Sequence, residues 1–325
     1  MQTVHNLHNR PPSQPATINP QMLHIQHPQN SETAYDAHAD VRSDCPILIW
    51  MLSLNREYTR EEYEECYKLV KDCLPHVKLE KQPENPDSFR QIMTEMLPLL
   101  MMRHRRIPRS KWRDYSTPNN KHWIEQVPET MPREKWLHSM IGYHLDIQGS
   151  LCGMAMTQGT RNRVINIGLA IRQLVVEPRG VSVAEYAESQ AHRLTELERE
   201  AILNKPDEIT LRRLAIILAL KQAYIRAIGQ PIGFDWSRLE FNIEERTATG
   251  DGNMLIGWEF RIFRANLGVI RRNKLYEEQY QCVCAFYRGH RHVRYIWHET
   301  NKELAEWVQF INIDQMLKVL PKLSA

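Results

Sequence analysis

Apolar and polar positions alternate in distinct ways along the chain, and each pattern predicts a different element. A short apolar, partly β-branched run over residues 46–54 is typical of a buried strand. Thr59 and Glu62, three residues apart, form a capping box that predicts a helix running to about Cys73. Apolar residues at helical spacing predict a second helix over residues 87–101, which Pro98 is expected to kink or end early.

Short alternating runs follow, separated by polar or glycine-containing breaks as in antiparallel strands. They predict three strands, at residues 143–147, 151–157 and 164–171. Three helices are expected next, at residues 183–188, 195–204 and 208–228, and the last of them ends at Gly229. The remaining pattern predicts four strands, at residues 238–243, 255–264, 280–287 and 293–297. A final helix is expected near residues 302–310.

Strands and helices therefore occur twice, which predicts an α+β fold of two similar α+β halves packed side by side. We place the N-terminal half at residues 45–165 and the C-terminal half at residues 166–325. Residues 1–44 are rich in Pro, Gln, Asn and His. Such a stretch cannot bury enough apolar area to offset the entropy lost on ordering, so we expect a disordered tail.

Composition limits the classes of function. Of 325 residues, 42% are apolar and 25% are charged, as in ordinary globular proteins. A net charge of +3 is too small for nucleic-acid binding by bulk electrostatics. One basic cluster, at residues 103–113, is compatible with a site for a phosphate or a nucleic-acid backbone or with a solvated helix end, and no second cluster supports the nucleic-acid interpretation. No run approaches the roughly 18 apolar residues of a membrane helix. We therefore expect a cytoplasmic protein with no nucleic-acid or membrane partner.

The most informative stretch lies between residues 217 and 241. It reads Lys221-Gln222-Ala223-Tyr224-Ile225-Arg226, then Gly229, then a strand that begins Arg238-Leu239-Glu240-Phe241. This order resembles the signature of the 4'-phosphopantetheinyl transferase superfamily, in its larger form with two fused halves. That signature is a Trp-x-x-Lys-Glu-(Ala/Ser)-(Tyr/Phe)-Ile-Lys helix, a glycine-rich turn and a similar strand. Weaker matches, at residues 107–112, 120–123, 145–149 and 166–171, extend the resemblance to about residues 46–287.

Enzymes of this family transfer phosphopantetheine from coenzyme A to a serine of a carrier protein. The resemblance therefore implies coenzyme A as a ligand and an acyl or peptidyl carrier protein as a partner. The chemistry needs a divalent ion on the pyrophosphate, cationic side chains and a proton acceptor. By resemblance, Lys121, Lys221 and Arg226 would bind the cofactor, and Lys221 and Glu198 would be the catalytic residues.

The sequence departs from the family at its ionic positions. Ala170 stands at the position of the metal-binding Asp, and Gln222 at that of the metal-binding Glu. Alanine offers no oxygen and a neutral amide is a poor ligand for a hard cation, so we expect the magnesium ligands to have been lost. The family's phosphate-binding Ser-His pair corresponds to Asp146 and Ile147. Its helix Arg falls near Thr94 or Glu95.

Two functional hypotheses follow. The first, which the paired loss of anionic ligands favours, is a pseudoenzyme that binds a carrier domain, a coenzyme-A-like ligand or a regulatory protein partner. The second is an active magnesium-dependent transferase with rewired ligands, for which His144, Asp146 and Glu198 are the candidates. The cleft between the halves is the expected site in both cases.

Overall fold

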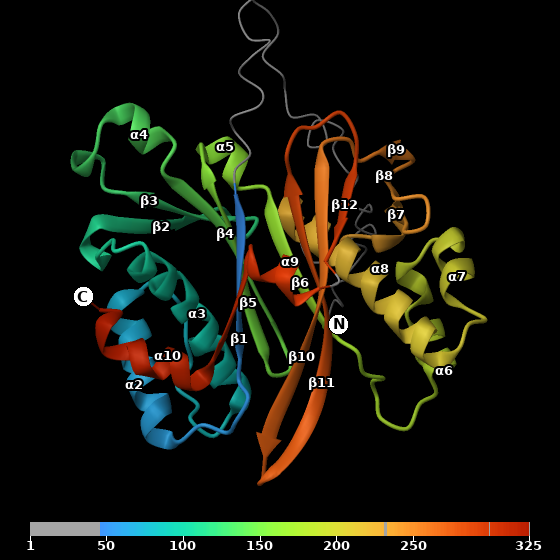
Figure 1. The fold of residues 1–325 in the computed structure, drawn as a ribbon, viewed down its shortest axis with the longest axis horizontal. Helices are drawn as coiled ribbons and strands as arrows, with labels where there is room; N and C mark the ends of the chain where they lie inside the picture. Colours follow the sequence, from blue (N-terminus) through green and yellow to red (C-terminus); the bar gives the residue numbers. More distant parts are fainter. Residues whose placement is uncertain (1–45, 231–232, 299, 325) are drawn as a thin grey trace, which may run out of the picture. The chain divides into compact units, whose positions relative to one another are not determined.

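Two large β-sheets pack face to face in the computed structural model, which describes residues 46–230, 233–298 and 300–324 (Figure 1). The fold is α+β, as the sequence predicts. The tail predicted to be disordered, residues 1–44, lies outside the described residues. No helix of the described part is long and apolar enough to cross a membrane.

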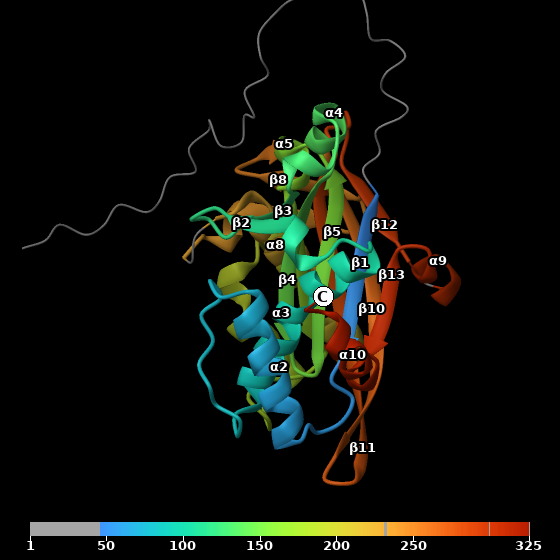
Figure 2. The same ribbon diagram turned by 90° about the vertical axis from the view of Figure 1, so that its left-hand side faces the viewer.

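The first sheet has six strands in the order β13-β1-β5-β4-β3-β2. Its strands are β1 (Ile47–Ser53), β2 (Trp112–Ser116), β3 (His122–Gln126), β4 (Met140–Gln148), β5 (Leu151–Gly159) and β13 (Val308–Asn312). Neighbours are antiparallel except β1 and β13, which are parallel. Three helices pack on its outer face: α2 (Arg60–Cys73), α3 (Pro86–His104) and α10 (Ile313–Val319). Figure 2 views the molecule from this helical side.

The second sheet has four strands in the order β12-β10-β11-β6. Its strands are β6 (Ile167–Gln173), β10 (Trp258–Arg271), β11 (Lys274–Tyr287) and β12 (Arg294–Trp297). The long helix α8 (Asp207–Ile228) packs across its outer face. Around α8 lie α6 (Val183–Ser189), α7 (Glu196–Ile202) and a small sheet of β7 (Leu239–Asn242), β8 (Thr247–Gly250) and β9 (Asn253–Met254). The other short helices are α4 (Arg133–Leu137), α5 (Arg161–Val164) and α9 (Asn301–Ala305).

Three apolar clusters hold these four layers together. One fills the space between α2, α3, α10 and the first sheet, the second lies between the two sheets, and the third lies between the second sheet and α8. Strand alternation explains the division, because successive side chains of β6 point into different clusters. Leu169 and Ile171 face the first sheet, whereas Ala170 faces α8.

The helix limits follow local signals in the sequence. The capping box of Thr59 and Glu62 opens α2, which ends at Cys73 as predicted. Helix α8 ends at Gly229, whose φ of 70° is left-handed and suits glycine. Pro98, however, does not end α3, which continues to His104. Burial of Leu97, Leu99 and Met101 against the sheet outweighs the hydrogen bond that proline removes.

The helix predicted near residues 302–310 is wrong in its second half. Only α9 is helical there, and β13 follows it as a strand in register with β1, with Gln309 opposite Trp50. The partner strand β1 lies more than 250 residues earlier, so no local pattern in the sequence indicates that β13 pairs with it. Helix α10 then packs into the core of the N-terminal helices. Strand β13 thus completes the first sheet. The division of the chain into two halves at residue 166 stays a prediction.

Candidate functional site

The two large sheets meet at the free edge of β6, where polar side chains of β4 and α8 bind its backbone. Asp146 accepts a hydrogen bond from the Ile171 N–H at 2.6 Å, and His144 accepts one from the Leu169 N–H at 3.4 Å. From the opposite side, Arg226 donates to the Leu169 carbonyl at 2.8 Å. The same guanidinium pairs with Asp146 at 2.7 Å. Arg226 and Asp146 therefore join α8 to β4 across the edge of β6.

Close packing of β6 on α8 makes this arrangement geometrically feasible. Gly168 lies directly against the helix backbone, since a Cβ atom built there would be 2.1 Å from the Ala223 carbonyl oxygen. Ala170, two residues on and on the same face, is fully buried in the apolar cluster with Ala223 and Leu220. The position on β6 that the resemblance assigns to a metal ligand is thus occupied by a small core side chain.

Lys221 and Glu198, the two residues predicted to be catalytic, form an ion pair of 2.6 Å in which both side chains are 0% exposed. Lys221 also donates to the backbone carbonyls of Arg193 and Trp236, at 2.7 and 3.0 Å. Glu198 accepts from the N–H groups of Thr195 and Phe241, at 2.9 and 2.8 Å. These bonds tie α7, α8 and β7 together, so the geometry gives the pair a structural role. Its part in catalysis stays a prediction.

Burial lowers the pKa of Lys221 and raises that of Glu198, and in each case the opposite charge of the partner counteracts the shift. Both directions favour neutral forms, which is the usual effect of removing an ionisable group from water. The hydrogen bonds that surround the pair limit this cost. If either residue lost its partner, the charge that remained buried would carry the full cost of desolvation.

Lys121, predicted to bind the cofactor, lies in the turn between β2 and β3. Its ammonium group donates to the Asn166 side chain at 2.6 Å, just before β6. Its stem lies close to Gly229 at the end of α8. Burial lowers the pKa of Lys121 to about 8. Lys121 and Arg226 therefore both lie where the two sheets meet, whereas Lys221 points toward α7, away from the edge of β6.

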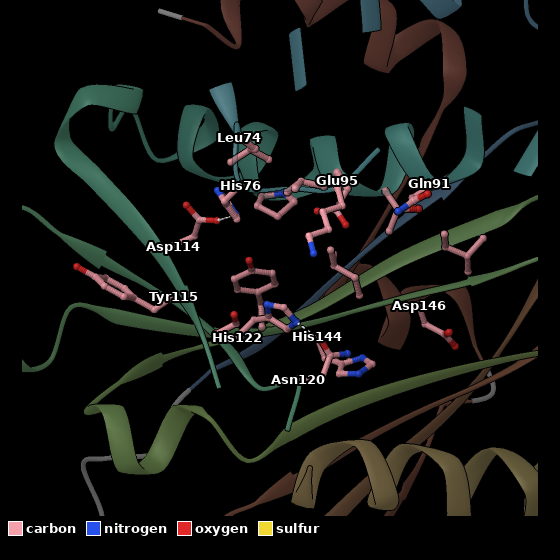
Figure 3. Close-up of a pocket in the computed structure, with 18 residues that line it drawn as sticks. Leu74, His76, Gln91, Glu95, Asp114, Tyr115, Asn120, His122, His144 and Asp146 are labelled. Carbon is pink, nitrogen blue, oxygen red and sulfur yellow. Dashed lines mark hydrogen bonds and ion pairs between the residues drawn. The ribbon is translucent and has the colours of Figure 1, made fainter. Parts of the chain in front are cut away.

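A cavity of about 660 Å³ opens between α3 and strands β2 to β4 (Figure 3). Positions that the resemblance assigns to phosphate binding converge there from distant parts of the sequence, namely Thr94, Glu95, Asp146 and Ile147, beside Asn120. Three carboxylates, Glu95, Asp114 and Asp146, line it together with Lys78 and the histidines His76, His122 and His144. Glu95 and Asp114 face it, and Asp114 forms an ion pair with His76 at 2.5 Å. The position of the cavity fits the resemblance, and its lining mixes acidic with basic side chains.

Glu95 provides a test of this cavity. Burial and the negative charge of Asp114 raise its pKa to about 7 from an ordinary 4.5. The folded state then holds a proton that the unfolded state releases, so the free energy of unfolding falls as pH rises from about 4.5 to about 7. We expect Glu95→Gln to be more stable than wild type at pH 8, by up to roughly 3 kcal/mol, and closer to it at pH 5. Urea unfolding at both pH values measures the difference, with the exposed Glu129→Gln as control. An equal difference at the two pH values would contradict the buried environment of Glu95.

The residues at the positions that the resemblance assigns to metal ligands do not fit a magnesium ion. Ala170 has no ligand atom, and the Gln222 side-chain oxygen is buried without a hydrogen-bond partner among the described residues. The candidates for a rewired site are engaged elsewhere: Asp146 by Arg226, Glu198 by Lys221, and His144 by the backbone of β6. Within the described ranges, no three His, Cys, Asp or Glu residues are grouped to hold a metal ion.

Comparisons with known proteins agree with the geometry at the level of the family. The 4'-phosphopantetheinyl transferase pptA of Paxillus involutus is 28% identical to this chain over 207 residues, which cover 60% of the chain and 75% of the relative. This similarity supports the superfamily that the sequence motifs indicate. No family model matches the chain.

Sequence reasoning missed Arg172, which lies on β6 two residues after Ala170. Strand alternation places the two side chains on the same face, so the spacing alone contains the signal. The Arg172 guanidinium lies 5.8 Å from the Trp236 ring, and that of Arg193 lies 4.9 Å from the same ring. Nothing local in the sequence indicates that Arg193 lies close to the same ring, because it comes from the loop between α6 and α7.

Proposed function

We propose that this chain is a phosphopantetheinyl-transferase-like pseudoenzyme that binds a carrier domain, a coenzyme-A-like ligand or a regulatory partner. The observation that carries the proposal is which residues occupy the two positions that the resemblance assigns to metal ligands. Ala170 is a buried core residue and Gln222 is neutral, while the nearby carboxylate of Asp146 is paired with Arg226. Without anionic ligands, a divalent ion has little to hold it where phosphoryl transfer needs its charge.

The burial of Lys221 and Glu198 also supports binding without turnover. A phosphate contact would require Lys221 to leave three hydrogen-bond acceptors, and Glu198 would then remain charged in an apolar environment. Such a rearrangement is costly, since breaking a buried pair typically costs about 3–5 kcal/mol.

A transfer assay tests the proposal. The full chain is incubated with labelled coenzyme A, magnesium and apo acyl or peptidyl carrier proteins, and the Paxillus involutus relative is run in parallel as positive control. We expect no labelled carrier above the protein-free background. Calorimetry with coenzyme A and separately with apo carrier should then give binding without turnover.

Labelled carrier that disappears on addition of EDTA would overturn the proposal in favour of an active, rewired transferase. In that case Asp146→Asn should abolish the product, because Asp146 is the candidate ligand nearest the edge of β6. Absence of binding to both coenzyme A and carrier proteins would remove those two ligands from the proposal and leave only a regulatory partner.

A further inference from the structure

The hairpin of β10 and β11 extends beyond the other two strands of the second sheet (Figure 1, Figure 2). Its strands pair along their whole length, whereas β6 pairs with β11 only at residues 280–286. A two-residue turn, Arg272 and Asn273, closes the hairpin, and both residues have the positive φ of a type I′ turn. Residues 274–278 of β11, which we call the hairpin edge, therefore pair with β10 on one side. No backbone hydrogen bond joins their other side to a described residue.

The backbone of the hairpin edge directs hydrogen-bonding groups toward solvent at Leu275 and Glu277. In an antiparallel pair, residues that bond to the opposite strand alternate with residues whose N–H and C=O point away from it. The pair next to a two-residue turn is a bonded one, so Leu275, Glu277 and Gln279 point away from β10. Gln279 follows this rule, since its carbonyl accepts a hydrogen bond from the Leu174 N–H at 2.8 Å. Leu275 and Glu277 thus offer two donors and two acceptors to a further strand.

Apolar side chains are exposed along the hairpin edge. Leu275 is 69% exposed and Tyr276 is 47% exposed. Ile270 of β10, which lies directly opposite Leu275, is also 47% exposed. Natural edge strands are usually protected by charges, proline, a bulge or a covering element. An open edge with exposed apolar side chains favours pairing with a further strand instead.

We propose that the hairpin edge pairs with the same edge of a second copy of this chain, antiparallel and about a two-fold axis at Tyr276. This register places Leu275 of each copy opposite the partner's Glu277, so that every outward backbone group of these residues finds a partner. A register centred at Leu275 would pair only one outward residue of each copy. A register centred at Glu277 would need the Gln279 carbonyl, which Leu174 already occupies. The inference is independent of the proposed function.

The side chains of the hairpin edge are complementary to themselves in this register. Lys274 lies opposite the partner's Glu278, and Tyr276 lies opposite the partner's Tyr276. Opposite charges and aromatic pairs directly across a sheet are both stabilising. On the other face, the two copies of Leu275 become diagonal neighbours and extend the apolar pair with Ile270. Such self-complementarity is what an isologous two-fold interface requires.

A second copy suits the hairpin edge better than a strand of uniform charge. The edge is positive at Lys274 and negative at Glu277 and Glu278. An acidic or a basic strand would meet a like charge near one of its ends, and like charges directly opposite each other are destabilising. A second antiparallel copy presents the two signs in reverse order and so avoids this repulsion.

Sedimentation equilibrium of the full chain over a range of concentrations tests the dimer. We expect the mass to rise from that of one chain toward that of two. Glu277→Pro should raise the dissociation constant at least about tenfold, because proline removes an outward N–H but no hydrogen bond to β10. Asn266→Pro is the matched control and should leave the dimer unchanged. Asn266 lies opposite Gln279, so its N–H points outward at the other edge of the hairpin.

Charge variants at position 276 test the register. Tyr276→Glu and Tyr276→Lys should each be monomeric, because the two-fold axis places like charges directly opposite each other. An equimolar mixture of the two variants should recover the dimer, since glutamate then faces lysine. If the axis lay at Leu275, position 276 would face the partner's Lys274, and Tyr276→Glu would strengthen the dimer instead. Circular dichroism shows that each variant is folded.

Three results would overturn the proposal. A wild-type chain that stays monomeric up to its solubility limit would exclude the dimer and leave the hairpin edge to a strand of another protein. Equal dimerisation of wild type and Glu277→Pro would place the interface elsewhere. A mixture of Tyr276→Glu and Tyr276→Lys that stays monomeric would exclude the register. None of these results bears on the transfer assay, which tests the proposed function separately.

Discussion

Lys221→Met should destabilise the protein by about 3–5 kcal/mol, because it leaves the Glu198 carboxylate buried without its counter-charge. The Lys221 ammonium group has three partners in the fold: Glu198, the carbonyl of Arg193 and the carbonyl of Trp236. Methionine fills a similar volume but offers no donor to any of them. Urea unfolding, followed by circular dichroism, measures the loss.

A double-mutant cycle separates the ion pair from the rest of the network. Glu198→Gln should be destabilising as well, and the double variant Lys221→Met/Glu198→Gln should lose less than the two single losses added together. We expect a coupling of about 1–3 kcal/mol, typical of partners in one buried network. Lys205→Met serves as the matched control, since Lys205 is an exposed lysine just before α8. A Lys221→Met variant within about 1 kcal/mol of wild type would show that the pair is not buried as described.

The structural role of Lys221 affects how activity assays of its variants are interpreted. Lys221→Ala would abolish transfer in an active enzyme, but it would also disrupt the contacts between α7, α8 and β7. Loss of activity in such a variant therefore does not identify a catalytic residue. Asp146→Asn is a better probe of chemistry, because the Asp146 side chain lies at the edge where the two sheets meet.

Elements defined by short-range patterns could be predicted from the sequence. The capping box at Thr59, the glycine end of α8 and the alternation of β4 and β5 each lie within a few neighbouring residues. Strand β13 could not be predicted, because its partner β1 lies at the other end of the described chain. Its short apolar run is equally compatible with the end of a helix.

The candidate site was likewise predictable only in part, because its contacts join residues that are distant in the sequence. The resemblance brought Glu95, Lys121 and Asp146 to one region, and the structure places them around one junction and one cavity. The resemblance assigned catalytic roles to Lys221 and Glu198, and nothing local in the sequence indicates that they pair in the core. The cluster of Arg172 with Arg193 depends on a loop that folds back over β6, and only tertiary structure brings the two together.

Gly168→Ala should cost about 3 kcal/mol, the upper end of what overpacking typically costs, since the added methyl group has no room between β6 and α8. Its Cβ atom would lie 2.1 Å from the Ala223 carbonyl oxygen and 2.6 Å from the Ala227 nitrogen. Both atoms belong to the helix backbone, so a side-chain rotation cannot relieve the clash. The strand and the helix must separate instead.

Separation of β6 from α8 would act on the site as well as on stability. The hydrogen bond from Arg226 to the Leu169 carbonyl spans this contact, and the pairing of Arg226 with Asp146 depends on it. We therefore expect Gly168→Ala to weaken coenzyme A binding, which the proposed function expects, together with its loss of unfolding free energy, both measured on the same preparation. Gly268→Ala on β10 is the matched control, because its Cβ would meet only a side-chain carbon of Leu275, at 3.2 Å. If the two glycine variants were equally stable, β6 and α8 could not approach as closely as the structure places them, and the junction that positions Arg226 would have to be rebuilt.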